Sequence, residues 1–170
     1  MFPIALNVAT LPILLVGKGK LLQRRMEQLE EAGAKHVTVM EGEVPSADVI
    51  AAHRVVMVVA LTREESQQIA DEARALGRLV NVEDVSDLCD FYFTANVRRG
   101  DLLVAISTAG ASPTLAKKVR DVIAARFGEE WSEHTKLIAA QRNQWKETGK
   151  TMKEIAVLSE RWLAEKGWFK

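Results

Sequence analysis

The stretch that decides the fold is Ile13–Leu22, which reads I-L-L-V-G-K-G-K-L-L. Apolar residues lead into two glycines, and apolar positions then recur at helical spacing as far as Gly33. A strand that runs through a glycine turn into a helix is typical of dinucleotide-binding folds. There Gly17 permits the tight turn, and Gly19 lets backbone N–H groups approach a pyrophosphate. A glycine turn in an α/β domain that binds no nucleotide is the alternative interpretation.

Further strands and helices are predicted to alternate along the chain. Short β-branched or apolar runs predict strands at Val37–Met40, Val55–Ala60 and Leu79–Val82. Arg63–Leu76 predicts a helix, with Thr62 as its N-cap. This order favours the α/β class and a Rossmann-like parallel sheet with right-handed crossovers.

A hairpin and then helices are predicted for the rest of the chain. The strand-like runs Phe91–Val97 and Leu102–Ser107 flank an R-R-G-D turn, which indicates an antiparallel hairpin. From Ser112 onward the pattern is helical, and Pro113 suits the first turn of a helix whose N-cap is Ser112. We therefore divide the chain into residues 1–90, residues 91–112 and residues 113–170.

Composition excludes several classes of protein. The chain has 170 residues, is 48% hydrophobic, and carries 23 basic and 23 acidic side chains. This balance argues against a disordered chain and against nucleic acid as the main partner. The single cysteine, Cys89, excludes an internal disulfide framework, and neither it nor the three histidines have metal-ligand spacing. No apolar run has membrane-spanning length and the start lacks signal-peptide features, so we expect a soluble cytoplasmic protein.

Polar segments follow three of the predicted strands. Glu41 ends the second strand, about 20 positions beyond Gly19, where an acidic side chain can hold a ribose diol. Asp84 follows the fourth strand at an edge where open α/β sheets bind ligands, and it could act as a general base. The hydroxyl- and glycine-rich loop Ser107–Pro113 could present N–H groups to an anion. The alternative for Asp84 is a solvated acidic loop, and the alternative for Ser107–Pro113 is a simple helix cap.

Taken together, these segments resemble the precorrin-2 dehydrogenase family, the N-terminal type of siroheme synthase. N-V-E-D at Asn81–Asp84 is similar to the family's N-V-x-D. F-Y-F-T-A-N-V-R-R-G-D-L-L-V-A-I-S-T at Phe91–Thr108 is similar to F-x-x-P-A-x-x-x-R-G-x-L-x-I-A-I-S-T. A-G-A-S-P-T-L-A-K-K-V-R at Ala109–Arg120 is similar to x-G-x-S-P-x-L-A-x-x-I-R. The resemblance covers roughly residues 1–130.

The resemblance implies an enzyme that oxidises precorrin-2 to sirohydrochlorin in siroheme biosynthesis, with NAD as its cofactor. Ferrous ion is a further substrate in members that are also chelatases. The family's catalytic carboxylate falls on Asp84. The implied cofactor-binding residues are Gly17, Gly19, Lys20, Leu21, Glu41, Gly42 and Glu43. Residues 1–90 would be the NAD-binding domain, residues 91–112 a dimerisation hairpin, and residues 113–170 a helical region of a homodimer.

The implied substrate is a polycarboxylate tetrapyrrole, and this gives meaning to an uneven charge distribution. Residues 1–113 carry 11 Lys and Arg against 15 Asp and Glu, whereas residues 114–170 carry 12 against 8. Cations around a polyanion are favoured by Coulomb attraction and charge-assisted hydrogen bonds. The predicted substrate-binding residues are Ser107, Thr108, Gly110, Ser112, Arg98, Arg99, Lys117 and Arg120, with Lys118 as a further candidate cation.

Departures from the family pattern define a second hypothesis. Leu22 replaces the usual small residue after the glycine loop, and Val59–Thr62 reads V-A-L-T in place of A-A-T-D. Thr94 replaces a proline, and the segment between Glu41 and Val55 is short. The alternative is therefore a tetrapyrrole- or nucleotide-binding module, or a chelatase alone, that has lost dehydrogenase activity.

Overall fold

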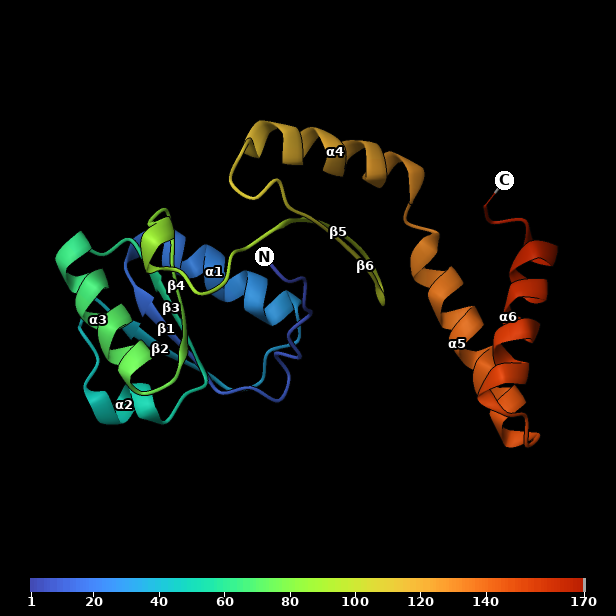
Figure 1. The fold of residues 1–170 in the computed structure, drawn as a ribbon, viewed down its shortest axis with the longest axis horizontal. Coiled ribbons are helices and arrows are strands. Elements are labelled where there is room, and N and C mark those ends of the chain that lie inside the picture. Colours follow the sequence, from blue (N-terminus) through green and yellow to red (C-terminus); the bar gives the residue numbers. More distant parts are fainter. Residues whose placement is uncertain (170) are drawn as a thin grey trace. The chain divides into compact units, whose positions relative to one another are not determined.

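Four short strands form a parallel sheet in the order β2-β1-β3-β4. The strands are β1 (Ile13–Gly17), β2 (Val37–Glu41), β3 (Val55–Val59) and β4 (Leu79–Val82). They lie in the first of the two compact units into which the chain divides, residues 1–93 and residues 94–170. The structure, a computed structural model, describes residues 1–169 (Figure 1).

Helices connect the strands, as a doubly wound sheet requires. The helices are α1 (Gly19–Glu31) after β1, α2 (Ala47–Ala51) after β2 and α3 (Arg63–Ala75) after β3, and the short helix η1 (Ser86–Leu88) follows β4. The predicted Rossmann-like order is confirmed, and the predicted cap Thr62 accepts a hydrogen bond from the Glu65 N–H at 3.2 Å. Sequence periodicity missed α2, because a helix of five residues is too short to show an apolar stripe.

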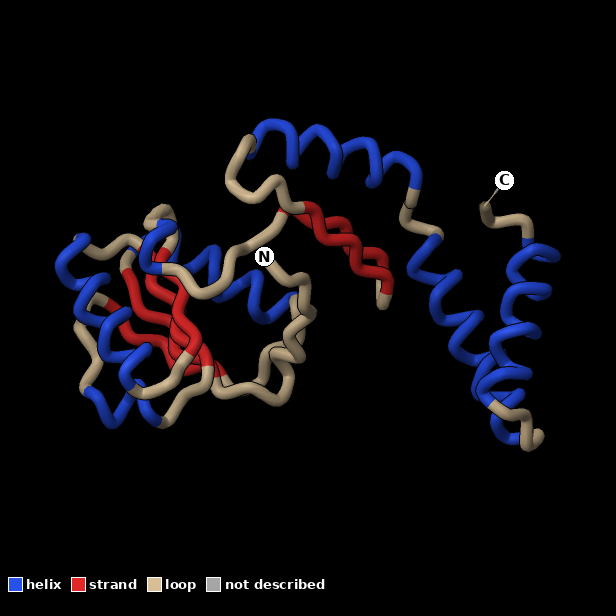
Figure 2. Tube along the Cα trace, viewed as in Figure 1, coloured by secondary structure: helices blue, strands red, loops and turns tan. Residues whose placement is uncertain are grey.

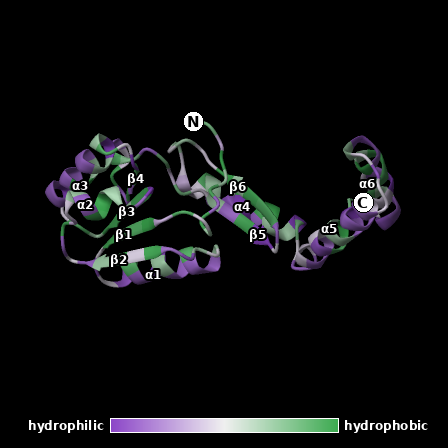
Figure 3. Ribbon diagram, turned by 90° about the horizontal axis from the view of Figure 1, so that it is seen from below, coloured by the Kyte–Doolittle hydropathy of each residue, from purple (hydrophilic) through white to green (hydrophobic). Residues whose placement is uncertain are grey.

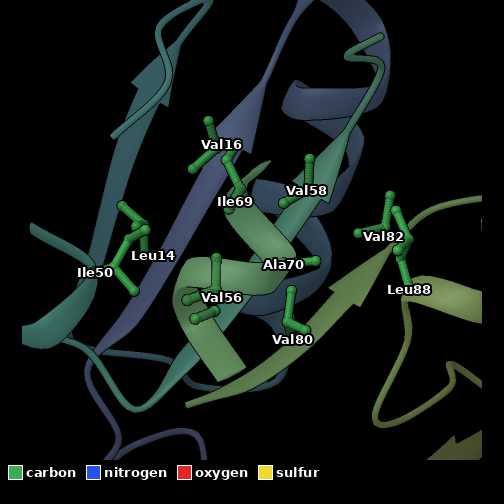
Figure 4. Close-up of a cluster of buried hydrophobic side chains, with 11 residues drawn as sticks. Leu14, Val16, Ile50, Val56, Val58, Ile69, Ala70, Val80, Val82 and Leu88 are labelled. Carbon is green, nitrogen blue, oxygen red and sulfur yellow. The ribbon is translucent and has the colours of Figure 1, made fainter. Parts of the chain in front are cut away.

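Each face of the sheet has its own buried core, because successive side chains point to opposite sides. Leu14 and Val16 pack on the face covered by α2 and α3, together with Ile69 (Figure 4). Ile13 and Leu15 pack on the face covered by α1. Burial on both faces explains why β1 and β3 contain no polar side chain.

Leu22 belongs to the core beneath α1. Its side chain is 7% exposed and shares a cluster with Leu15, Val59 and Leu29. A leucine therefore fills the space between helix and sheet that a small residue leaves in the family pattern. Its bulk points into the core, away from the exposed turn at Lys18 and Gly19.

A returning segment covers the outer edge of β4. The Asp90 carboxylate accepts a hydrogen bond from the Val80 N–H at 3.0 Å, and the Asp90 N–H donates to the Val80 carbonyl at 2.8 Å. The Cys89 Sγ lies 3.3 Å from the Val82 nitrogen and donates to the Val82 carbonyl at 3.1 Å. Exposed strand edges invite pairing with other chains, so this cover protects the sheet. Cys89 has a structural role here.

The second unit is a hairpin followed by helices (Figure 2). Its elements are β5 (Ala95–Arg99), β6 (Leu102–Ile106), α4 (Pro113–Arg126), α5 (Trp131–Glu147) and α6 (Met152–Lys166). The predicted antiparallel hairpin is confirmed, although its first strand begins at Ala95 and not at Phe91. Because Phe91 packs instead against the core beneath α1, the chain enters the ladder only at Ala95, which pairs with Ile106.

Aromatic side chains organise the helical part of the second unit. Trp131 is buried and meets Phe127 and Trp168 edge-on, with ring centroids 4.9 and 6.3 Å apart. His134 stacks on Trp168 at 4.0 Å. Polar and apolar residues alternate along α5 and α6, whereas β1 is uniformly apolar (Figure 3). Within residues 1–169, no helix combines the length and apolar character needed to cross a bilayer.

Candidate functional site

The carboxyl ends of the four parallel strands bring four polar segments to one edge of the sheet. Gly17, the last residue of β1, is paired in register with Glu41 of β2 and with Val59 of β3. Val58 is paired with Val82 of β4, two residues before Asp84. Ligands bind at this edge in open α/β sheets, because the loops and the helix N-termini converge there.

The two glycines of the turn after β1 serve different purposes. A Cβ on Gly17 would overlap the Val59 carbonyl oxygen, so this position needs glycine for the close approach of β3. Gly19 has φ +62°, a left-handed conformation that side chains disfavour, and a Cβ there would meet none of the described atoms within 4 Å. The backbone before α1 is therefore packed tightly against β3 at Gly17, whereas at Gly19 it has open space beside it.

The start of α1 fits a pyrophosphate, whereas the start of α3 does not. Lys18, the N-cap of α1, makes no side-chain cap within the described chain, and the first turn of α1 contains no acid. At α3 a capping box of Thr62 and Glu65 satisfies the first N–H groups, and Glu64 adds a second acid. Free N–H groups and the helix dipole favour an anion at α1. Lys20 and Leu21 are exposed in that first turn.

The end of β2 is tied to the glycine turn and can hold a ribose. The Gly42 N–H donates to the Gly17 carbonyl at 3.0 Å, so Glu41 is fixed directly beside the turn. Gly42 has φ +77°, and a Cβ there would lie 3.2 Å from Cε of Lys18. Glu41 and Glu43 are exposed, which leaves the Glu41 carboxylate available to a diol. The residues present therefore fit a dinucleotide.

Lys18 also reaches the opposite side of the turn. Its Nζ lies 3.7 Å from Oε1 of Glu65, the acid that caps α3. Hydrogen bonds from the Thr62 backbone N–H and hydroxyl, and the charge of Lys18, hold the pKa of Glu65 below its ordinary value. The Glu65 carboxylate is therefore already used to cap α3. The Lys18 side chain extends from Gly42, after β2, to Glu65 at the start of α3.

Asp84 stands at the same edge in an unusual backbone conformation. It is exposed and has φ +64°, and Ala60, which follows β3, has φ +53°. Left-handed conformations of residues other than glycine are costly and persist where the surrounding structure holds them, often at functional sites. Asp84, the predicted general base, therefore lies in a strained turn with its carboxylate exposed.

The predicted tetrapyrrole residues group at the start of α4 in the second unit. Two hydrogen bonds join Thr108 and Ser112. The Ser112 N–H donates to the Thr108 hydroxyl at 3.2 Å, and that hydroxyl donates to the Ser112 carbonyl at 3.1 Å. The Ser112 hydroxyl caps α4 by accepting from the Leu115 N–H at 3.1 Å, as predicted. Gly110 lies between them with φ +84°, and Ser107 is exposed.

The predicted cations of the second unit differ in their engagement. Arg99 is held by the Phe127 carbonyl at 3.0 Å and by Glu129 at 3.3 Å. Arg120 pairs with the adjacent Asp121 at 2.6 Å. The remaining candidates are exposed at the surface of the unit: Arg98, Lys117 and Lys118.

Sequence reasoning missed one residue that contacts this region, Arg25 on α1. It is buried, and its Nη2 lies 3.2 Å from Oε2 of Glu83, the residue before Asp84. The available signal was its position, because a charged residue between Leu22 and Leu29 falls on the apolar stripe of the helix.

This sheet, its glycine turn and its open edge define a dinucleotide-binding α/β domain. The chain belongs to the family described as "Putative NAD(P)-binding", whose model matches residues 4–95. A second model, described as "Sirohaem biosynthesis protein central", matches residues 99–126, which include β6 and the whole of α4.

Curated siroheme synthases are similar to this chain in sequence. The chain is 37% identical over 149 residues to a siroheme synthase of Methylococcus capsulatus, an alignment that covers 74% of this chain and 31% of the relative. It is 32% identical over 141 residues to siroheme synthase 1 of Klebsiella pneumoniae, covering 72% and 30%. The chain thus spans about 30% of the length of these relatives.

A solved structure has the same fold. SirC, a precorrin-2 dehydrogenase, superimposes with a TM-score of 0.74 and 20% sequence identity, covering 95% of this chain and 88% of SirC. The coverage extends across both units, so the Rossmann-like sheet, the hairpin and the C-terminal helices are all elements of a known fold.

Proposed function

We propose that this chain oxidises precorrin-2 to sirohydrochlorin in siroheme biosynthesis, with NAD as cofactor and Asp84 as general base. The observation that carries the proposal is the shared edge of the sheet. There the uncapped start of α1, the Glu41 carboxylate and the strained Asp84 turn follow β1, β2 and β4 of one parallel sheet. The siroheme synthase relatives and the fold of SirC support it.

The chemistry divides between cofactor and protein. NAD supplies the hydride acceptor when it is bound. The Asp84 carboxylate accepts the proton that leaves the tetrapyrrole with the hydride, so the substrate loses two electrons and two hydrogens in total. An exposed carboxylate at the edge of the sheet is accessible for this transfer, and the turn that holds it limits its reorganisation.

Glu41 favours NAD over NADP. An acid at this position accepts hydrogen bonds from the ribose hydroxyls and repels a 2′-phosphate. Cofactor contacts are proposed for the residues of the turn and of the end of β2: Gly17, Gly19, Lys20, Leu21, Glu41, Gly42 and Glu43.

Substrate carboxylates are proposed to contact the loop before α4 and nearby cations. Ser107 and the N–H groups around Gly110 supply donors, while Arg98, Lys117 and Lys118 supply exposed charge. Thr108 and Ser112 shape the loop through their mutual hydrogen bonds. Arg99 and Arg120 already have partners within the unit and would contribute mainly to the local field.

The decisive experiment supplies the protein with precorrin-2 and either NAD or NADP and follows sirohydrochlorin absorbance together with NADH or NADPH. We expect turnover with NAD and a markedly lower rate with NADP. A folded protein that produces no NADH above background would contradict the proposal.

A binding module or a chelatase is the second candidate, and one observation favours it. The segment where the family has Thr-Asp ends here at Thr62, whose side chain caps α3. Tetrapyrrole binding without NAD affinity would identify a binding module. Conversion of sirohydrochlorin with added ferrous or cobaltous ion would identify a chelatase, with the metal ion as substrate and Asp84 accepting pyrrole N–H protons.

We further propose that the protein is a homodimer and that it is located in the cytoplasm. Apolar side chains on α4 support an association surface, because Leu115 is 52% and Val122 is 70% exposed. Sedimentation equilibrium would reveal the dimer, and a monomer at micromolar concentration would contradict it.

A further inference from the structure

Arg25 is a buried cation on the face of α1 that packs against the sheet. Its side chain is 11% exposed and lies between the core residues Leu22 and Leu29. A buried guanidinium is strongly unfavourable unless its charge and its donors are matched. The partners of Arg25 therefore indicate why an arginine is held there.

Three groups surround the guanidinium, and two of them, Glu83 and Phe93, come from the segment that follows β4. Nη2 lies 3.2 Å from Oε2 of Glu83, Nη1 donates to Oε1 of Gln28 at 2.8 Å, and Cζ lies 3.7 Å from the ring centroid of Phe93. Nε is buried and has no partner in the part of the chain that the structure describes. An apolar side chain would fill this place without an unpaired donor, so stability alone does not account for the arginine.

The ion pair acts on the residue next to Asp84. The Glu83 N–H donates to the Val58 carbonyl at 2.9 Å, and the Val85 N–H donates to the Val82 carbonyl at 3.2 Å. Asp84 lies between these two anchors with φ +64°. A left-handed aspartate relaxes unless its neighbours are restrained, and Arg25 restrains the Glu83 side chain from the α1 side.

We propose that Arg25 is a positioning residue that holds the Glu83–Asp84 turn through its ion pair with Glu83. Because Arg25 belongs to the helix that begins at the pyrophosphate site, it also couples that helix to the base. The inference rests on the proposed function, since it concerns how Asp84 is presented. Arg25 itself need not touch substrate or cofactor.

Two variants of the full chain test this role, and a third is the control. Arg25→Met removes the charge and keeps much of the volume, while Glu83→Gln removes the partner charge and leaves Arg25 in place. Arg24→Met is the matched control, because Arg24 is the neighbouring arginine on the same helix and is exposed.

Amide hydrogen exchange reports the turn directly and needs no activity. We expect the Val85 amide to exchange at least tenfold faster in Arg25→Met and in Glu83→Gln, with the amides of β1 within twofold of wild type. Arg24→Met should leave the Val85 amide unchanged. Unchanged exchange at Val85 in both test variants, or equal acceleration at every amide, would overturn the proposal.

Steady-state kinetics then separate positioning from cofactor binding. We expect Arg25→Met to lower kcat at least tenfold while KM for NAD stays within threefold of wild type. Arg25→Lys should recover part of the loss, because lysine keeps the charge and lacks the planar fork. A wild-type kcat in Arg25→Met would overturn the role in the reaction.

Failure of the proposed function is distinguishable from failure of this inference. If the wild-type chain does not oxidise precorrin-2 but Val85 exchange accelerates selectively, the dehydrogenase assignment falls and the positioning of the turn stands. If Arg25→Met does not fold, Glu83→Gln decides the question, because it removes a charge without removing volume.

Discussion

Gly17 at the end of β1 lies against Val59 at the end of β3, so closely that a methyl group on Gly17 would overlap the Val59 carbonyl oxygen. The two residues are partners in the parallel ladder. The first glycine of the turn is therefore required by the distance between two strands. The second, Gly19, is required by its positive φ.

Gly17→Ala should destabilise the first unit more than Gly19→Ala. The overlap with Val59 forces the ends of two strands apart and should cost about 3 kcal/mol. Gly19→Ala has open space and incurs the left-handed penalty, about 1 kcal/mol. Urea unfolding followed by far-UV circular dichroism measures both.

Tryptophan fluorescence provides the internal control for this comparison. All four tryptophans lie in the second unit, at positions 131, 145, 162 and 168, so their emission reports that unit. We expect the dichroism transition to shift and the fluorescence transition to shift less. Equal stabilities for the two variants would refute the steric argument at Gly17.

Asp84→Gly should separate stability from activity. Glycine adopts φ +64° without strain, so the variant should be about 1 kcal/mol more stable than wild type. Loss of the base should lower kcat by roughly 10²–10⁴. Asp84→Asn should lose activity without the gain in stability, because asparagine also tolerates this conformation less well than glycine.

The control for Asp84 is Asp71→Asn on α3, another exposed carboxylate. It should keep both stability and rate. An Asp84→Gly variant with full activity would remove this residue from the mechanism.

Glu41→Ala should shift cofactor preference toward NADP. Loss of the ribose contact should weaken NAD binding about tenfold, or about 1.4 kcal/mol, and loss of repulsion should strengthen NADP binding. Calorimetric titration with both nucleotides measures the ratio. Glu30→Gln, an exposed acid later on α1, serves as control, and an unchanged ratio in Glu41→Ala would place the ribose elsewhere.

Glu65→Gln should alter the acid sensitivity of the first unit. Hydrogen bonds from Thr62 and the charge of Lys18 hold the pKa of Glu65 below its ordinary value of 4.5. A lowered pKa in the folded state contributes stability above the ordinary pKa and loses it as the pH falls through the folded value. Wild type should therefore be more stable than Glu65→Gln at pH 7, and the difference should vanish in acid.

Glu64→Gln is the matched control for this pH dependence, since it removes the same charge from the neighbouring position. Thermal melts of the three proteins from neutral pH to about pH 3 make the comparison. A stability difference for Glu65→Gln that persists unchanged in acid would disprove the role of its carboxylate.

Cys89 should react slowly with thiol reagents at neutral pH. Burial raises the pKa of the thiol above its ordinary value of 9.0, and its Sγ donates to the Val82 carbonyl. The modification rate should lie well below that of glutathione and should rise after urea exposes the thiol. Modification at the rate of free glutathione in the native protein would show that the β4 edge is open.

Much of the fold was predictable because its signals are local. The apolar runs of β1 and β3, the glycine turn and the caps Thr62 and Ser112 each predict a short segment from neighbouring residues. The helix α2 and the start of the hairpin were not predictable in this way. A helix of five residues is too short to show periodicity, and Phe91 packs against core residues that are far away in the sequence.

The sequence by itself determined the α/β class, the order along the chain of the four strands with α1 and α3, and the two caps. It also identified Asp84, Glu41 and the Ser107–Pro113 loop as candidates. Tertiary structure alone decided that Gly17 is required by Val59, that Arg99 is held by the Phe127 carbonyl, and that Arg25 reaches Glu83. The physical reason is distance along the chain. Helix periodicity and capping depend on residues a few positions apart, whereas buried ion pairs and close strand contacts join residues that meet only after folding.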